Sequence, residues 1–141
     1  MFYSFIQTSD DRIPMLARLA LGIVIVPHGA LTLLDAQSAG FALGALQWLA
    51  IFAEVVGGTA LVVGVLGRLA ALVVAAHLIL AVLETHWSFG FFMNWSGEQP
   101  GEGFEFHILA ITLAIVVVIR GSGALSIDRL LTTRRDGIAL G

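Results

Sequence analysis

The sequence contains no cysteine and no lysine, and only 12% of its 141 residues are charged. Without cysteine the chain has no disulfide, no thiolate-ligated metal, no iron–sulfur cluster, no covalently attached c-type haem and no cysteine nucleophile. A soluble domain carries roughly 25% charged residues. Ten carboxylates against seven arginines give a net charge of −3. This balance is too weak and too dispersed to indicate a nucleic-acid partner.

Apolar residues are what the sequence has in excess, at 58% of the chain with a mean hydropathy of +0.96. One helical crossing of a bilayer takes about 20 apolar residues. Four stretches approach that length, and they cover residues 13–34, 43–65, 69–85 and 104–120. The sequence therefore predicts a single all-α domain over residues 1–141, an integral membrane four-helix bundle with up-down-up-down topology.

The connections between these segments differ in length and composition. A brief link rich in small residues is predicted around 35–40, and glycines at 64–68 predict a tight turn between antiparallel helices. The third connection, 86–103, is long and carries several aromatic residues together with glycines. That composition is typical of a loop lying in the membrane interface.

The arginines predict the orientation of the chain. With four crossings, all seven lie on the side that holds both termini and the second connection, and none lies on the other side. By the positive-inside rule, both termini face the cytoplasm and the protein lies in the inner membrane. Beyond the fourth segment, Ser126 and Asp128 are capping residues for a short helix over 127–132, which is expected to lie on the cytoplasmic surface.

Ionisable side chains inside the predicted crossings are the candidates for chemistry. Each costs about 2.5–3.5 kcal/mol at the centre of a membrane helix, so each needs a partner or a purpose. At a rise of about 1.5 Å per residue from the arginines, these groups fall in one layer between the middle and the outer half of the bilayer. The predicted catalytic residues are His28, Glu54 and His107, and the predicted rim of the same site is His77, Glu84, His86, Glu102 and Glu105.

Helical spacing indicates which way the predicted helices face. Arg18, Gly22, Ile25 and Gly29 form one stripe, with His28 on its margin. A second stripe starts at Glu54 and continues through Gly57, Gly58 and Leu61. Stripes that combine small residues with a polar one are typical of faces turned toward another helix, because glycine lets two backbones approach closely.

Histidine and glutamate side chains at this depth are compatible with three kinds of site. The pair His28 and His107 could ligate a b-type haem, and histidine with carboxylates could bind a transition metal. The third is a site for proton exchange with a quinone head group, using Glu54 as the relay. No metal-ligand spacing is present, so no metal site is expected, and a quinone is favoured over haem. Hydrogen bonding between helices is the simpler interpretation of each polar residue taken singly.

Several short motifs in order resemble the DoxX family of small four-helix membrane proteins over residues 16–131. The matching pieces are Arg18-x3-Gly22 with His28-Gly29; Glu54-x2-Gly57-Gly58-x2-Leu61-x2-Gly64-x3-Arg68; His86; Gly90-Phe91-Phe92-Met93-Asn94-Trp95; residues 101–109; and Gly121-x-Gly123-x2-Ser126-Ile127-Asp128. The family often has a lysine three or four residues after the His-Gly pair, where this chain has Thr32 and Leu33.

The resemblance implies a role in membrane oxidoreductase complexes that counter oxidative and thiol stress, because DoxX-like proteins are similar to the membrane subunit of thiosulfate:quinone oxidoreductase. Without cysteine, sulfur chemistry would fall to a partner protein. The leading hypothesis is a membrane subunit of a quinone-linked oxidoreductase complex. The alternatives are a non-catalytic scaffold that docks a partner and a small proton or solute transporter. The expected partners are the lipid bilayer and a second protein or a second copy of the chain.

Overall fold

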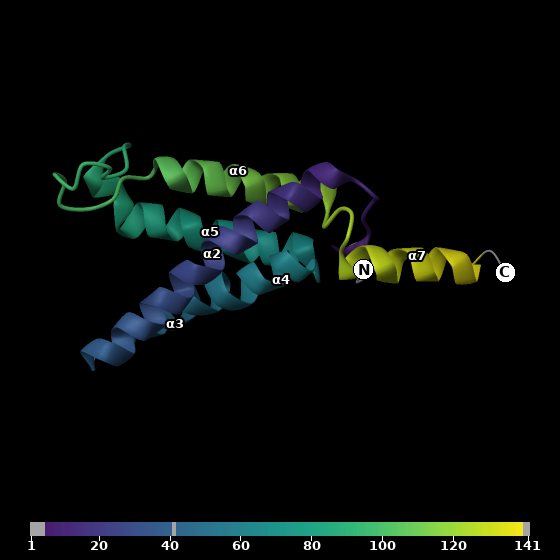
Figure 1. Ribbon diagram of the computed structural model, residues 1–141, viewed down its shortest axis with the longest axis horizontal. Helices are drawn as coiled ribbons and strands as arrows, with labels where there is room; N and C mark the ends of the chain where they lie inside the picture. The colour runs from purple at the N-terminus through teal and green to yellow at the C-terminus, as the bar shows by residue number, and fades with distance from the viewer. Residues whose placement is uncertain (1–4, 41, 140–141) are drawn as a thin grey trace.

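The computed structural model describes residues 5–40 and 42–139, with side chains described to residue 133, and the regular structure in that part of the chain is entirely helical. Figure 1 shows long helices side by side, with α7 projecting from one end. The elements are α2 (Arg12–Ala39), α3 (Ala45–Ile51), η1 (Phe52–Gly57), α4 (Gly58–Val63), α5 (Gly67–Glu84), η2 (His86–Phe89), α6 (Glu105–Arg120) and α7 (Ile127–Ala139).

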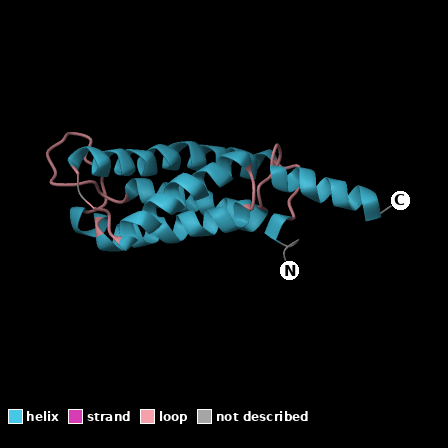
Figure 2. Ribbon diagram, turned by 90° about the horizontal axis from the view of Figure 1, so that it is seen from below, coloured by secondary structure: helices cyan, strands magenta, loops and turns pink. Residues whose placement is uncertain are grey.

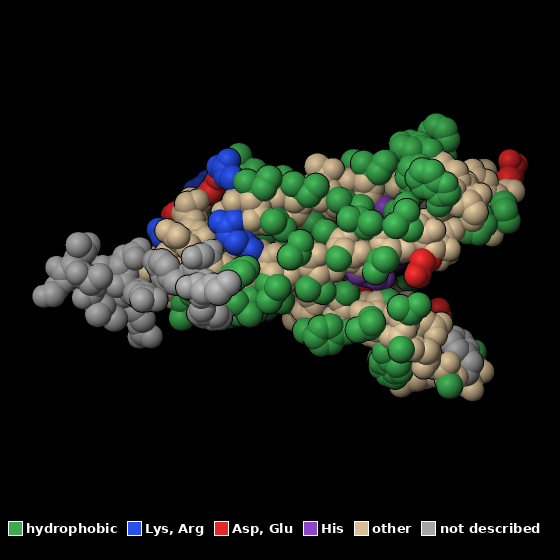
Figure 3. All heavy atoms as spheres, turned by 180° about the vertical axis from the view of Figure 1, so that it is seen from behind, with side chains coloured by type: hydrophobic (Ala, Val, Ile, Leu, Met, Phe, Trp, Pro, Cys, Tyr) green, Lys and Arg blue, Asp and Glu red, His purple; other side chains and the backbone are tan. Residues whose placement is uncertain are grey.

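Three helical segments in the described chain are long and apolar enough to cross a membrane. They are α2, the segment Ala45–Val63, and α5. In the segment Ala45–Val63, α3, η1 and α4 follow one another without a break and form one rod, called the second rod below. The fourth, α6, packs along α5 but has only 16 residues. Large apolar side chains such as Leu16, Leu72 and Leu109 point outward from these helices, and hydrophobic side chains are spread along the helices on the face shown in Figure 3. Such a surface is consistent with contact to lipid.

The first helix is longer than the sequence predicted. The prediction of a link around 35–40 is wrong, because α2 continues to Ala39. The helix ends at Gly40, which adopts the left-handed conformation with φ of 67°. Nothing between 35 and 39 breaks a helix, and the side chain of Ser38 donates to the carbonyl of Asp35 at 3.0 Å. Glycine tolerates positive φ without a steric penalty, so the helix stops where the first glycine of the segment stands.

Glycines bring α2 against the second rod, as the stripe pattern predicted. A Cβ atom added to Gly22 would lie 2.7 Å from the carbonyl oxygen of Gly58 and 2.7 Å from the side chain of Val62. At Gly29 it would lie 2.8 Å from the Cβ of Glu54. Close backbone contact of this kind supplies the van der Waals packing that holds helices together in lipid.

At the end of the molecule that carries the arginines, Arg18 is buried rather than solvated, with 1% of its surface exposed. Its guanidinium donates five hydrogen bonds of 2.6–3.1 Å, to the carbonyl oxygens of Leu61, Val62, Ser122, Ala124 and Leu125. The carbonyls at the end of α4 have no partner within the helix, so the arginine caps them. Arg18 thereby ties α2 to α4 and to the segment that follows α6.

Asp128 completes this buried polar cluster. Its carboxylate accepts the backbone N–H groups of Leu66 and Gly67, each at 2.9 Å, and the hydroxyl of Ser122 at 2.5 Å. The sequence assigned Asp128 to capping its own short helix, but the structure uses it on the start of α5. Ser126 is the residue that caps α7, accepting the N–H of Arg129 at 3.1 Å.

The C-terminal helix α7 is longer than the predicted helix over 127–132, and its direction differs from the expected one. In Figures 1 and 2 it runs away from the bundle, roughly along the long axis of the molecule, rather than across its end. This direction differs from the one expected of a helix that lies flat across the end of the bundle. The helix is anchored to the bundle through Asp128 and, one turn later, through Thr132, whose hydroxyl donates to the carbonyl of Ile6 at 3.3 Å.

The Asp11 carboxylate at the start of α2 yields a prediction about pH. It accepts the N–H of Ile13 at 2.9 Å and a guanidinium N–H of Arg120 at 2.5 Å. The Ile13 amide first, and the Arg120 cation after it, hold the pKa of Asp11 below its ordinary value.

Because the pKa is lowered in the folded state, this contact stabilises the fold fully above the unfolded pKa and is lost as the pH falls through the folded one. We expect Asp11→Asn to lower stability near neutral pH, with a difference from wild type that vanishes in acid. Unfolding followed over a pH series checks this, with the exposed neighbour Asp10→Asn as the control. A difference that persists unchanged at acid pH would contradict the assignment.

Candidate functional site

At the end of the bundle away from the arginines, a cavity of about 340 Å³ lies between α2, the second rod, α5, the long loop and α6. It is lined by all four histidines of the chain and by two glutamates; the lining residues are Ile25, His28, Thr32, Ala50, Glu54, His77, Leu78, Ala81, His86, Met93, Glu102, Phe106 and His107. Figure 3 shows histidine side chains in the hollow between the helices. His28, Glu54 and His107, which the sequence analysis grouped, are all among these lining residues.

Glu54 and His77 form one pair in this cavity. The Nε2 atom of His77 lies 3.1 Å from Oε1 of Glu54, and both side chains are mostly buried. Glu54 belongs to η1, a π-helical segment with one extra residue per turn, and such segments are frequent at functional sites. Gly29 of α2 leaves the space that the Glu54 side chain occupies. The sequence carries no signal for the π-helix.

His86 and His107 form a second pair, contributed by η2 and α6. Their ring centroids lie 4.2 Å apart, and Nδ1 of His86 is 2.8 Å from the carbonyl oxygen of Glu102. His107 is 7% exposed, and its Nδ1 atom has no hydrogen-bond partner among the described residues. A buried polar atom without a partner costs about 1–3 kcal/mol, so this nitrogen favours a polar ligand atom in the cavity.

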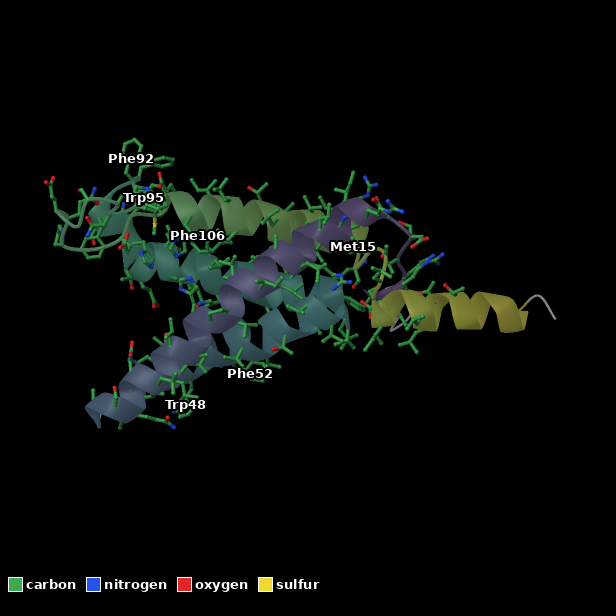
Figure 4. The ribbon with its side chains drawn as sticks, in the orientation of Figure 1. Met15, Trp48, Phe52, Phe92, Trp95 and Phe106 are labelled. Atoms are coloured by element: carbon green, nitrogen blue, oxygen red, sulfur yellow. The ribbon has the colours of Figure 1, made fainter. Side chains whose placement is uncertain are left out.

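His28 reaches the cavity from α2. Its ring stacks on Phe106 with centroids 5.8 Å apart and an interplanar angle of 20°, and Phe106 also contacts His107 edge to face. Figure 4 shows Phe106 at the loop end of α6, on the side that faces the other helices. The sequence analysis did not include Phe106 or Thr32 among the site residues. Their positions indicate the site, because Thr32 lies one helical turn after His28 and Phe106 directly precedes His107.

Two of the five predicted rim residues lie elsewhere. Glu84 lines a neighbouring groove between the second rod and α5. Glu105 faces outward, where its carboxylate accepts the indole N–H of Trp95 at 2.9 Å. Because Glu105 precedes His107 by two residues, its side chain points to nearly the opposite side of α6. Glu102 does line the cavity, but its carboxylate accepts the backbone N–H of Asn94 at 2.7 Å and thereby shapes the loop.

The site can exchange protons, but its described residues are not arranged to hold a metal ion. No group of three or more His, Cys, Asp or Glu side chains is close enough for that in the part of the chain that the structure describes. Toward the arginine end the cavity meets tightly packed apolar side chains, with Leu21, Leu61, Val74 and Val117 at 1% exposure or less. The described titratable residues of this site, histidine and glutamate, accept and donate protons.

Comparison with known proteins places much of this site in one family. The sequence profile of the DoxX family matches residues 13–87, which is more than half of the chain and runs from α2 into η2. The matched range includes His28, Glu54, His77 and His86. The loop and α6, with Glu102 and His107, lie outside it. No match was found among curated proteins or among solved structures.

Proposed function

The chain belongs to the DoxX family of membrane proteins, and from this premise we propose that it is the membrane subunit of a quinone-linked oxidoreductase complex. The resemblance to this family implies a role in membrane oxidoreductase complexes. The observation that carries the proposal is the polar cavity, which four histidines and Glu54 from separate helices line, and in which Nδ1 of His107 has no hydrogen-bond partner among the described residues.

The proposal includes four crossings, with α6 as the fourth and both termini in the cytoplasm. The arginine side chains visible in Figure 3 gather at one end of the molecule, which supports a cytoplasmic position for that end in the inner membrane. The cavity then opens in the outer half of the bilayer. The 16 residues of α6 suffice for a crossing when the flanking loop lies within the interface, as its exposed Trp87, Phe92 and Trp95 favour.

Reduction of a quinone to a quinol adds two electrons and two protons, one proton at each oxygen. The electrons come from a redox partner protein. The protons come from this chain, since imidazole and carboxyl groups both donate and accept protons. We assign the protonated Nδ1 of His107 as the hydrogen-bond donor to one quinone oxygen, and the Glu54–His77 pair as the proton relay to the other.

The geometry favours this function over the alternatives. A haem between His28 and His107 would have to displace Phe106, on which both rings pack. A transporter needs a route to both sides of the membrane. The buried apolar core between the cavity and the arginine end contains no such route among the described residues. The volume of about 340 Å³ lies within the range of small-molecule sites, about 300–1,000 Å³.

Quinone binding is the first test. His107→Phe keeps an aromatic ring but removes the donor, so we expect a short-chain quinone to bind about tenfold more weakly, the equivalent of one hydrogen bond. Titration of the purified protein in mild detergent measures this. The control is Ile115→Phe, on the exposed side of the same helix. Failure of the wild-type protein to bind quinone would overturn the proposal.

The role of Glu54 is tested without the unidentified partner by reducing the bound quinone at an electrode. We expect the infrared difference spectrum to contain a carboxyl signal that Glu54→Gln removes and Glu98→Gln retains, because Glu98 lies outside the cavity. If Glu54→Gln lowers only the thermal stability and leaves quinone binding and this spectrum unchanged, Glu54 is a packing residue, and a scaffold is the better description.

A further inference from the structure

A second hollow runs beside the polar cavity, between the second rod and α5. This α3/α5 groove has a volume of about 550 Å³ and is mostly apolar. Its lining residues are Leu46, Gln47, Leu49, Ala50, Phe52, Ala53, Val73, Ala76, His77, Leu80, Ala81, Glu84 and Thr85. At about 1.5 Å per residue, the stretch of α5 from Val73 to Glu84 is about 17 Å long, so the groove is long and narrow.

The groove and the cavity lie next to each other. Ala50, His77 and Ala81 line both of them. Two of these three residues are alanines, so the junction is bordered by small side chains, and the third is the partner of Glu54. A single molecule with a polar end and a long apolar end can therefore occupy both spaces, with its polar end among the histidines.

The groove opens toward the surrounding lipid. α3 packs on α2 and on η1 but makes no substantial contact with α5, and Figure 1 shows the α2–α3 pair diverging from α5 and α6. The walls carry exposed apolar side chains, with Leu46 and Leu49 at 64% and Leu80 at 52% exposure. Since lipid lies against these helices, an apolar chain can enter sideways from the bilayer without passing through water.

We propose that the α3/α5 groove is the tail site for a lipid-soluble quinone, whose ring enters the polar cavity while its isoprenoid tail lies between the second rod and α5. This inference rests on the proposed function and adds the substrate class: a long-tailed membrane quinone rather than a soluble one. A phospholipid fits less well, because among the described residues no arginine lines the cavity or the groove to pair with a phosphate.

The test compares two quinones that share a ring, one with a long isoprenoid tail and one with a short chain. Ala76 lines the groove but not the cavity, so Ala76→Trp fills the groove and leaves the ring site intact. We expect the affinity for the long-tailed quinone to fall about tenfold or more, and that for the short-chain quinone to change by less than about twofold. Ala20→Trp, at an exposed position of α2, is the control.

A second pair of variants serves if Ala76→Trp does not fold. Leu80 and Leu72 are similarly exposed on α5, at 52% and 55%, but only Leu80 lines the groove. We expect Leu80→Asn to weaken binding of the long-tailed quinone selectively and Leu72→Asn to leave it unchanged.

The outcomes separate the two proposals. If the wild-type protein binds neither quinone, the proposed function fails and the tail site fails with it. If it binds the short-chain quinone and the groove variants change both affinities equally or not at all, only the tail site is wrong. Loss of a retained phospholipid from Ala76→Trp in native mass spectrometry, with unchanged affinity for the long-tailed quinone, would make the groove a lipid site instead.

Discussion

Replacement of Arg18 by leucine is expected to lower the free energy of unfolding by about 3–5 kcal/mol, the range for breaking a buried charged cluster by removing one partner. The guanidinium donates to five backbone carbonyls and is buried. Leucine leaves these acceptors without donors and leaves the nearby Asp128 carboxylate without its cation. Denaturant unfolding in detergent micelles, followed by circular dichroism, measures the change.

Two further variants interpret that result. Arg12→Leu removes an exposed arginine from the same end of α2 and should change stability by less than about 0.5 kcal/mol. Arg18→Lys keeps the charge but offers a single ammonium in place of the planar fork, so its stability should lie between those of wild type and Arg18→Leu. Equal stability of Arg18→Leu and Arg12→Leu would show that the cluster does not hold the helices together.

Gly22→Val is the second substitution with a large expected effect, a loss of about 3 kcal/mol from overpacking. The added Cβ would meet the carbonyl oxygen of Gly58 and a methyl group of Val62, each at 2.7 Å. The Val62 side chain can rotate away, but the Gly58 oxygen belongs to the backbone, so α2 and the second rod must move apart.

The same unfolding measurement checks this prediction. Ala20→Val places the same side chain two residues earlier on the exposed face of α2, so it reports the intrinsic cost of a β-branched residue in the helix. A loss at Gly22→Val no greater than at Ala20→Val would mean that the contact between Gly22 and Gly58 is looser than the structure has it.

These two contacts also explain why the site lies where it does. Arg18 and the glycines close the bundle at the arginine end and along α2, so the helices can diverge only at the other end. The cavity and the α3/α5 groove occupy that divergence. The closely packed arginine end thus positions Glu54, His77 and His107, while the opposite end of the bundle holds the cavity and the groove.

Properties that depend on nearest neighbours along the chain could be predicted from the sequence. The apolar stretches predict the helices, because length and hydropathy are local quantities. The spacing of Gly22, Gly29 and Gly58 predicts which faces meet, because the helical period fixes which residues share a side. Position along a helix follows from the rise per residue, and on that basis the sequence grouped His28, Glu54 and His107, which line one cavity.

Only the tertiary structure decided which of these groups pair and what each one contacts. The π-helix at Glu54, the pairing of His86 with His107 and the burial of Arg18 against carbonyls far along the chain have no signature in a local pattern. Each depends on contacts between segments separated by twenty residues or more, and the free energy of such contacts is set by how whole helices pack. The sequence therefore determined the helices and their facing sides, whereas packing determined the site.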